Sequence, residues 1–158
     1  MNLFPTWVLY ILTTIGATER VTPPDGLADE IASAAELHPL PGPQGPERMA
    51  AVLVAIAWAE SRLLPGAIGD QGQSLGPFQL SRSWGSSNAA KAAELVLVSF
   101  AICSAHPLEH RLSWYAYGRV GCDHAHAASA HRMALAAKLL RMAPPPPRMP
   151  QDAPAPTP

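Results

Sequence analysis

The sequence lacks an excess of charge of one sign. Its 11 Lys and Arg residues nearly balance 12 Asp and Glu residues, which gives a formal net charge of −1. The basic residues are scattered and form no run, so the electrostatic footprint of a nucleic-acid-binding protein is missing. We therefore expect no nucleic-acid partner. A length of 158 residues fits one domain, and 48% apolar residues are enough for a core.

The sequence also lacks the usual motifs of metal, phosphate and nucleophile sites. It contains no Gly-rich phosphate loop, no nucleophilic serine elbow and no His-Glu-x-x-His segment. A group of metal-binding residue types, Cys122-Asp123-His124-Ala125-His126 with His131, does not have the paired spacing of a structural zinc site. On a helix, His124 and His126 diverge because they are two residues apart. We expect no metal ion and no cofactor.

No apolar run is long enough for a confident membrane span. The apolar stretch 3–17 has about the length of a signal-peptide core, but no Lys or Arg precedes it. Ile15-Gly16-Ala17 matches a small-x-small cleavage site only in part. Two interpretations of residues 1–20 stay open, namely an export signal and an N-terminal apolar helix packed on the domain.

Cysteine is scarce, because Cys103 and Cys122 are the only two in the chain. Outside the cytosol the two thiols can pair, and closing a loop of this size stabilises a fold by about 3 kcal/mol. The alternative is a pair of buried thiols. Cys103 continues an apolar stripe with Leu95, Val96 and Ile102, where a free cysteine packs as a small hydrophobe. The sequence favours neither interpretation.

Proline marks the boundaries within the chain. Eight of the fifteen residues from 144 to 158 are proline, which predicts a disordered, extended C-terminal arm. Such arms are pre-ordered ligands, so a protein partner for residues 144–158 is one expected role. A second proline-rich stretch, 39–46, separates two helix candidates. We expect the folded domain at residues 24–143.

Mainly α structure is predicted for this domain. Pro46 suits a first helical turn and Asn88 suits an N-cap, whereas Pro65 disfavours helix at the residue before it. The Gly- and Ser-rich segment 65–87 has no long apolar period, so a structured loop or short irregular strands are expected there. The predicted helices are 26–37, one that starts at Pro46, carries Glu60 and is stopped by Pro65, then 89–105, 107–118, and a last amphipathic helix marked by Met133, Ala136, Ala137 and Leu140.

Glu60 is the leading candidate for a catalytic residue. Met49, Leu53, Ile56 and Glu60 are spaced by 4, 3 and 4 residues, so the glutamate ends an apolar stripe on its predicted helix. A charge is not expected on such a stripe. A carboxylic acid that protonates a glycosidic oxygen works best when it is partly buried. The position of Glu60 on this stripe therefore suits a general acid.

Three segments support this hypothesis by their order along the chain. They are Glu60-Ser61, then Ser74 with Gly76-Pro77-Phe78-Gln79-Leu80, then Tyr115-Ala116-Tyr117-Gly118. Together they resemble the lysozyme-like superfamily, in particular the soluble lytic transglycosylase type of peptidoglycan-cleaving domain. In that family a catalytic Glu-Ser precedes a Gly-Leu-Met-Gln-type segment and an Ala-Tyr-Asn-Ala-Gly-type segment. The third match is incomplete, because the family Asn falls on Ala116 or on Gly118 and one sugar-contacting amide is missing.

The resemblance covers residues 49–118 and implies a fold and an activity. The fold is a lysozyme-like α+β domain with a much reduced β part. The activity is cleavage of the β-1,4 bond between N-acetylmuramic acid and N-acetylglucosamine in peptidoglycan strands by a bacterial or phage enzyme. Glu60 is expected to act first as general acid to the glycosidic oxygen and then as base to the muramic 6-hydroxyl. We expect a monomer that needs no second carboxylate.

Other site residues are assigned from the same resemblance. Tyr115 and Tyr117 are two residues apart, so at most one of them is expected to face the cleft. Asp70, in Gly69-Asp70-Gln71-Gly72, is interpreted as a turn former in preference to a second carboxylate. Three tryptophans, Trp58, Trp84 and Trp114, are more typical of a core than of a sugar platform. The predicted substrate-binding residues are Ser61, Ser74, Gln79 and Tyr115, although Ser61 and Ser74 equally suit local backbone hydrogen bonds.

Two alternatives to the transglycosylase stay open. A lysozyme-type hydrolase requires Asp70 to hold a water molecule. A non-catalytic lysozyme-like module of a secretion machine or phage particle fits the missing Asn and the proline-rich arm. An export signal places the protein in the cell envelope or periplasm, or outside the cell, and its absence implies a cytoplasmic or virion-associated protein.

Overall fold

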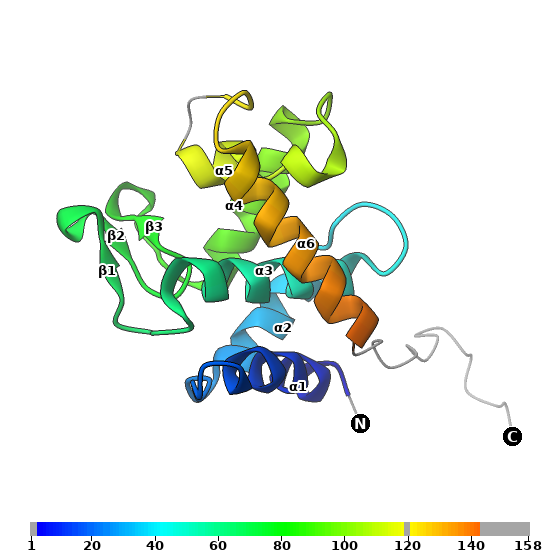
Figure 1. The fold of residues 1–158 in the computed structure, drawn as a ribbon, viewed down its shortest axis with the longest axis vertical. Helices are drawn as coiled ribbons and strands as arrows, with labels where there is room; N and C mark the ends of the chain where they lie inside the picture. Colours follow the sequence, from blue (N-terminus) through cyan, green and yellow to red (C-terminus); the bar gives the residue numbers. More distant parts are fainter. Residues whose placement is uncertain (1–2, 119–120, 143–158) are drawn as a thin grey trace, which may run out of the picture.

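Helix α3 (Gly45–Ser61) lies at the centre of the molecule. The computed structural model describes residues 3–118 and 121–142. Figure 1 shows α6 (His126–Met142) crossing α3 on one side, with α1 (Phe4–Ala17) and α2 (Leu27–Leu37) beneath it. From Met49 to Trp58 every residue of α3 is apolar and buried, as expected for a helix surrounded by others. The core is therefore built around α3.

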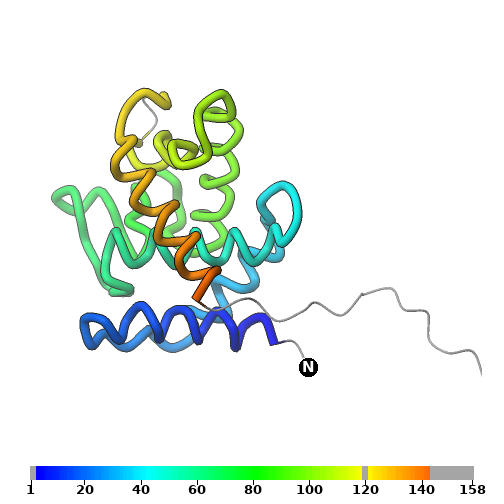
Figure 2. The backbone as a smooth tube through the Cα atoms, turned by 45° about the vertical axis from the view of Figure 1, so that its right-hand side comes forward, coloured from blue at the N-terminus to red at the C-terminus, as the bar shows by residue number. Residues whose placement is uncertain are grey.

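The N-terminal apolar stretch forms helix α1, which packs on α2 and α3. Its buried face consists of Phe4, Trp7, Val8, Ile11, Leu12 and Ile15. The tube in Figure 2 shows α1 running along the base of the molecule. Within the described part of the chain, no helix has the length and apolar character needed to cross a membrane.

A small antiparallel sheet follows α3. Its strands are β1 (Ile68–Gly69), β2 (Ser74–Leu75) and β3 (Leu80–Ser81), in the order β1-β2-β3. The register places Gly69 opposite Ser74 and Leu75 opposite Leu80. Short 3-10 turns η1 (Asp70–Gly72) and η2 (Arg82–Trp84) flank the strands. The segment 65–87 was expected to be a structured loop or short irregular strands, and it contains these three short strands.

The rest of the fold is helical, which confirms the mainly α prediction. Helix α4 (Ala89–Ile102) begins at Asn88, whose side chain accepts a hydrogen bond from the Lys91 N–H as an N-cap. It ends three residues before the predicted boundary. The predicted arm at 144–158 lies outside the described residues.

The single helix predicted over 107–118 is wrong. The structure has a 3-10 turn, η3 (Leu108–His110), and a short helix, α5 (Ser113–Tyr117), in its place. Two buried serines explain the break. The hydroxyl of Ser99 on α4 donates to the Arg111 carbonyl, and the hydroxyl of Ser129 on α6 accepts from the Leu112 N–H. Backbone groups that a continuous helix would pair internally are thus taken by neighbouring helices.

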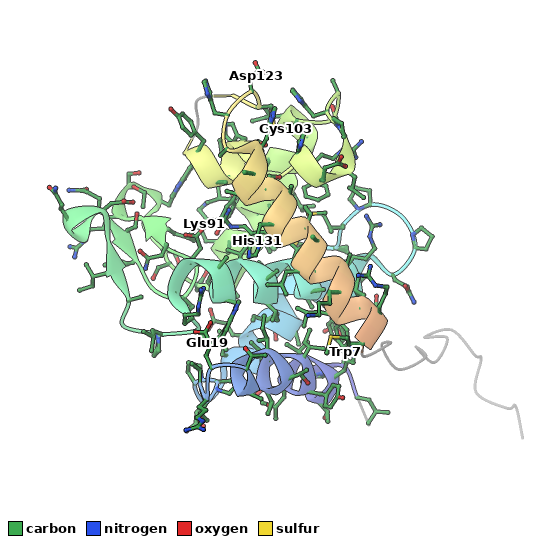
Figure 3. All side chains as sticks on the ribbon, in the orientation of Figure 1. Trp7, Glu19, Lys91, Cys103, Asp123 and His131 are labelled. Carbon is green, nitrogen blue, oxygen red and sulfur yellow. A yellow bond between two sulfur atoms is a disulfide. The ribbon has the colours of Figure 1, made fainter. Side chains whose placement is uncertain are left out.

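Cys103 and Cys122 form a disulfide, which decides between the two interpretations of the cysteines. The bond joins the end of α4 to the segment that precedes α6. Figure 3 shows Cys103 in the same end of the molecule as Asp123, far from Trp7 on α1. The disulfide therefore connects two of the elements that surround α5.

Candidate active site

One cavity brings together the three leading candidates from distant parts of the sequence. Glu60, Gln79 and Tyr115 all line a cavity of about 630 Å³. Glu60 comes from the end of α3, Gln79 from the loop before β3, and Tyr115 from α5. A cavity of this volume is in the range that accommodates a drug-sized ligand, which is also the size of a short oligosaccharide.

Glu60 is presented at the cavity by the way α3 ends. The helix ends at Ser61, shortly before the break expected at Leu64 and Pro65. Arg62 and Leu63 then adopt left-handed conformations with φ of 54° and 66°. Their N–H groups donate to the carbonyls of Trp58 and Ala57, which completes the helix end. The Glu60 side chain is 22% exposed, so it is partly desolvated and still reaches the cavity.

Arg132 is the partner of Glu60 and was not predicted from the sequence. Its Nη2 donates to Oε1 of Glu60, and its side chain is 11% exposed. The Arg132 Nε is buried and has no hydrogen-bond partner among the described residues. Arg132 shares one face of α6 with three buried residues, Ser129, Ala136 and Leu139. A charge on that buried stripe was the available signal, as it was for Glu60.

Tyr115 closes the cavity next to Glu60. Its hydroxyl donates to the Phe78 carbonyl at 3.2 Å, and its N–H donates to Oγ of Ser99 at 3.1 Å. Burial raises the pKa of the Tyr115 phenol well above its usual range, and the negative charge of Glu60 raises it further, while Arg132 opposes the shift. The phenol is therefore neutral and acts as a hydrogen-bond donor.

Gln79 holds the loop that faces Glu60. Its Nε2 donates to the Ala67 carbonyl at 3.2 Å and to the Gly76 carbonyl at 2.9 Å. Its backbone is left-handed, with φ of 47°. Gly69 lies so close that a Cβ there would be 2.1 Å from Oε1 of Gln79. Gln79 thus positions the backbone while its side chain lines the cavity.

The two predicted serines have different surroundings. Ser61 is buried, does not line the cavity, and donates to the Pro77 carbonyl at 2.9 Å, so it joins the end of α3 to the loop before Gln79. Ser74 lines the cavity and donates to Oδ2 of Asp70 at 2.6 Å. Asp70 is exposed, has a left-handed backbone in η1 and also lines the cavity. It therefore forms the predicted turn and also contributes a second carboxylate to the cavity wall.

The expectation that at most one tyrosine faces the cavity is wrong, because Tyr115 and Tyr117 both line it. Helix α5 has only five residues, and the cavity wraps around its C-terminal end at Gly118. Trp84 and Trp114 also line the cavity, although tryptophan was expected in the core. Trp58 does meet that expectation, being buried, with the Arg62 guanidinium 5.1 Å from its ring centroid.

The histidine-rich segment makes ring contacts. His110 and His126 stack with centroids 4.1 Å apart, and His124 stacks on Tyr117 at 4.6 Å. Among residues 3–118 and 121–142, no three His, Cys, Asp or Glu side chains are grouped so as to hold a metal ion. Comparison of the chain with protein-family models, with curated proteins and with solved structures found no match.

Proposed function

We propose that the protein is a glycan-cleaving enzyme of the lytic transglycosylase type that acts on the β-1,4 bond between N-acetylmuramic acid and N-acetylglucosamine. The observation that carries the proposal is the meeting of Glu60, Gln79 and Tyr115 at one cavity. These residues come from the three segments that resemble the family, and they are separated by 19 and 36 positions in the sequence. The three segments that carry the resemblance therefore contribute to one cavity, as a common site requires.

The proposed fold is the lysozyme-like arrangement with a reduced β part. Two features support it. The glutamate lies at the end of a buried central helix, and a small antiparallel sheet follows that helix directly. Residues of the sheet region and of α5 line the same cavity as Glu60.

In the proposed reaction Glu60 first gives a proton and then accepts another. Its protonated carboxyl gives the proton to the glycosidic oxygen as the bond to the anomeric carbon breaks. The muramic 6-hydroxyl then closes on that carbon and returns a proton to the Glu60 carboxylate. The product is an anhydromuramic end, and no water is consumed.

Arg132 can assist both proton-transfer steps, because it contacts the carboxyl group of Glu60. A neutral carboxyl can accept the Arg132 hydrogen bond at Oε1 and carry its proton on Oε2. When that proton leaves, the guanidinium stabilises the carboxylate that forms, at a site where little water competes. Arg132 also fixes the orientation of the carboxyl group, which suits it to directional proton transfer.

We propose that the protein acts as a monomer and that its partner is the peptidoglycan strand. Disulfides persist in oxidising compartments, so the Cys103–Cys122 bond supports a location in the cell envelope or outside the cell. The arm at 144–158 is proposed to serve as a ligand for a protein partner. No cofactor is required by the proposed reaction.

Two alternatives each have one observation in their favour. A lysozyme-type hydrolase is favoured by Asp70, whose carboxylate lines the cavity with Glu60 and could hold a water molecule. A non-catalytic module of a secretion or phage assembly is favoured by the Arg132 contact, because it occupies one oxygen of Glu60.

Product analysis separates the three functions. Purified protein is incubated with peptidoglycan sacculi in ¹⁸O-labelled water, and the fragments are analysed by mass spectrometry. The transglycosylase predicts anhydromuramic ends without the label. Labelled reducing ends would establish the hydrolase. Sacculi that stay intact would indicate the non-catalytic module.

A further inference from the structure

Two tryptophans from separate elements meet in the wall of the cavity. Trp84 ends the turn η2, and Trp114 lies in α5. Their ring centroids are 6.4 Å apart with planes inclined by 58°. Both rings are partly buried and line the cavity that contains Glu60. The pair therefore places two inclined indole rings side by side in the cavity wall.

A charged network holds Trp84 in place. Lys91 Nζ lies 5.7 Å from the ring centroid of Trp84, within the range of a cation–π contact. Lys91 is itself paired with Oε2 of Glu94 at 2.9 Å. The ring is thus oriented before any ligand arrives, which lowers the entropy cost of binding to it.

Polar side chains form much of the remaining wall, beside Leu80 and Leu95. Six oxygen- or amide-bearing side chains come from the segment that runs from η1 to η2, and they are Asp70, Gln73, Ser74, Gln79, Ser81 and Ser83. A pyranose ring has an apolar face of C–H groups and an edge of hydroxyl groups. An aromatic surface with hydroxyl, amide and carboxylate partners beside it complements both parts of such a ring.

We propose that Trp84 and Trp114 form a stacking platform for a sugar ring of an acetamido glycan, adjacent to the ring cleaved at Glu60. This inference rests on the proposed function for its substrate class. It adds that the cavity holds at least two consecutive rings, one at the carboxyl group and one on the indoles. Tryptophan is among the residues that most often dominate binding energy in such pockets.

The test measures binding without turnover. Every variant carries Glu60→Gln, and the probe is tetra-N-acetylchitotetraose, a β-1,4-linked acetamido oligosaccharide. Calorimetry gives the Kd, and tryptophan fluorescence reports burial of an indole. We expect Trp84→Ala or Trp114→Ala to raise the Kd about tenfold or more, and Trp84→Phe to restore part of the loss because it keeps an aromatic face.

Trp7→Phe is the matched control, because Trp7 is buried on α1 and does not line the cavity. It should leave the Kd and the fluorescence change intact. Thermal melts of all variants identify any that fail to fold. If Trp84→Ala is one of them, the Kd of Trp84→Phe tests the proposal in its place. Absence of binding to the parent, or an unchanged Kd in a folded Trp84 variant, would overturn the platform. Tight binding through Trp84 by a protein that cleaves nothing would support the platform and reject the proposed catalysis instead.

Discussion

Arg132 donates to Oε1 of Glu60 across 72 residues of sequence, and this bond ties helix α6 to the end of α3. Both side chains are largely buried, with 11% and 22% exposed. When Glu60 is ionised, removal of either partner leaves the other charge partly buried without its counter-charge. The pair is therefore both a structural link and a part of the candidate site.

We predict that Arg132→Met lowers the free energy of unfolding by about 2 kcal/mol, because it leaves Glu60 partly buried without its cation. Urea unfolding measures the change. The double variant Arg132→Met with Glu60→Gln should lose less free energy of unfolding than the two single variants lose together, since each change removes the same contact. Strict additivity would contradict the pairing.

A methyl group at position 69 should disturb Gln79. In Gly69→Ala the new Cβ would lie 2.1 Å from Oε1 of Gln79, so the amide must shift, which weakens its two hydrogen bonds. We expect a loss of about 1 to 2 kcal/mol in urea unfolding. Gly66→Ala is the control, because nothing lies within 4 Å of its Cβ. The cost of Gly69→Ala should shrink in a Gln79→Ala background, and an equal cost there would rule out this contact.

Tyr115 should make the fold sensitive to alkali. Burial and the charge of Glu60 raise the pKa of its phenol above that of an unfolded tyrosine, near 10. Above about pH 10 the unfolded chain therefore loses a proton that the folded chain retains, so stability falls as pH rises. Tyr115→Phe should flatten this fall between pH 9 and pH 11, measured by urea unfolding.

Tyr10→Phe serves as its control, because Tyr10 is 57% exposed. That substitution should leave the slope of stability against pH unchanged. A wild-type slope in Tyr115→Phe would contradict the burial of the phenol.

The Cys103–Cys122 bond should contribute about 3 kcal/mol, because it closes a loop of sequence separation 19 and so restricts the unfolded chain. Reduction should lower the melting temperature of the wild type. The Cys103→Ser, Cys122→Ser double variant should melt at the reduced value and respond to no reductant. Equal melting with and without reductant in the wild type would mean that the bond does not form.

Much of the helical structure was predictable because its signals are local. Apolar periodicity, Pro46 and the Asn88 cap indicated α3 and α4, and each signal acts within a few residues of the element. The Gly- and Ser-rich composition of 65–87 indicated the short strands for the same reason. The order of the motifs predicted that Glu60, Gln79 and Tyr115 would meet.

The features that were missed depend on contacts between distant segments. The break between η3 and α5 arises because Ser99 and Ser129 bond to its backbone, and neither serine lies in that segment. Arg132 was missed because its partner is on another helix. Trp84 and Trp114 reach the cavity only when η2 and α5 are packed together, which no local pattern reveals.

The measurement that tests the central claim most directly is cleavage of peptidoglycan sacculi by Glu60→Gln. The amide is nearly isosteric but has no proton to give, and general acid–base catalysis contributes about 10² to 10⁴ in rate. We predict a folded variant whose release of anhydromuramic fragments falls at least 100-fold, while Glu36→Gln on the exposed face of α2 retains the parent rate. Wild-type cleavage by Glu60→Gln would contradict the assignment of Glu60 as the catalytic acid.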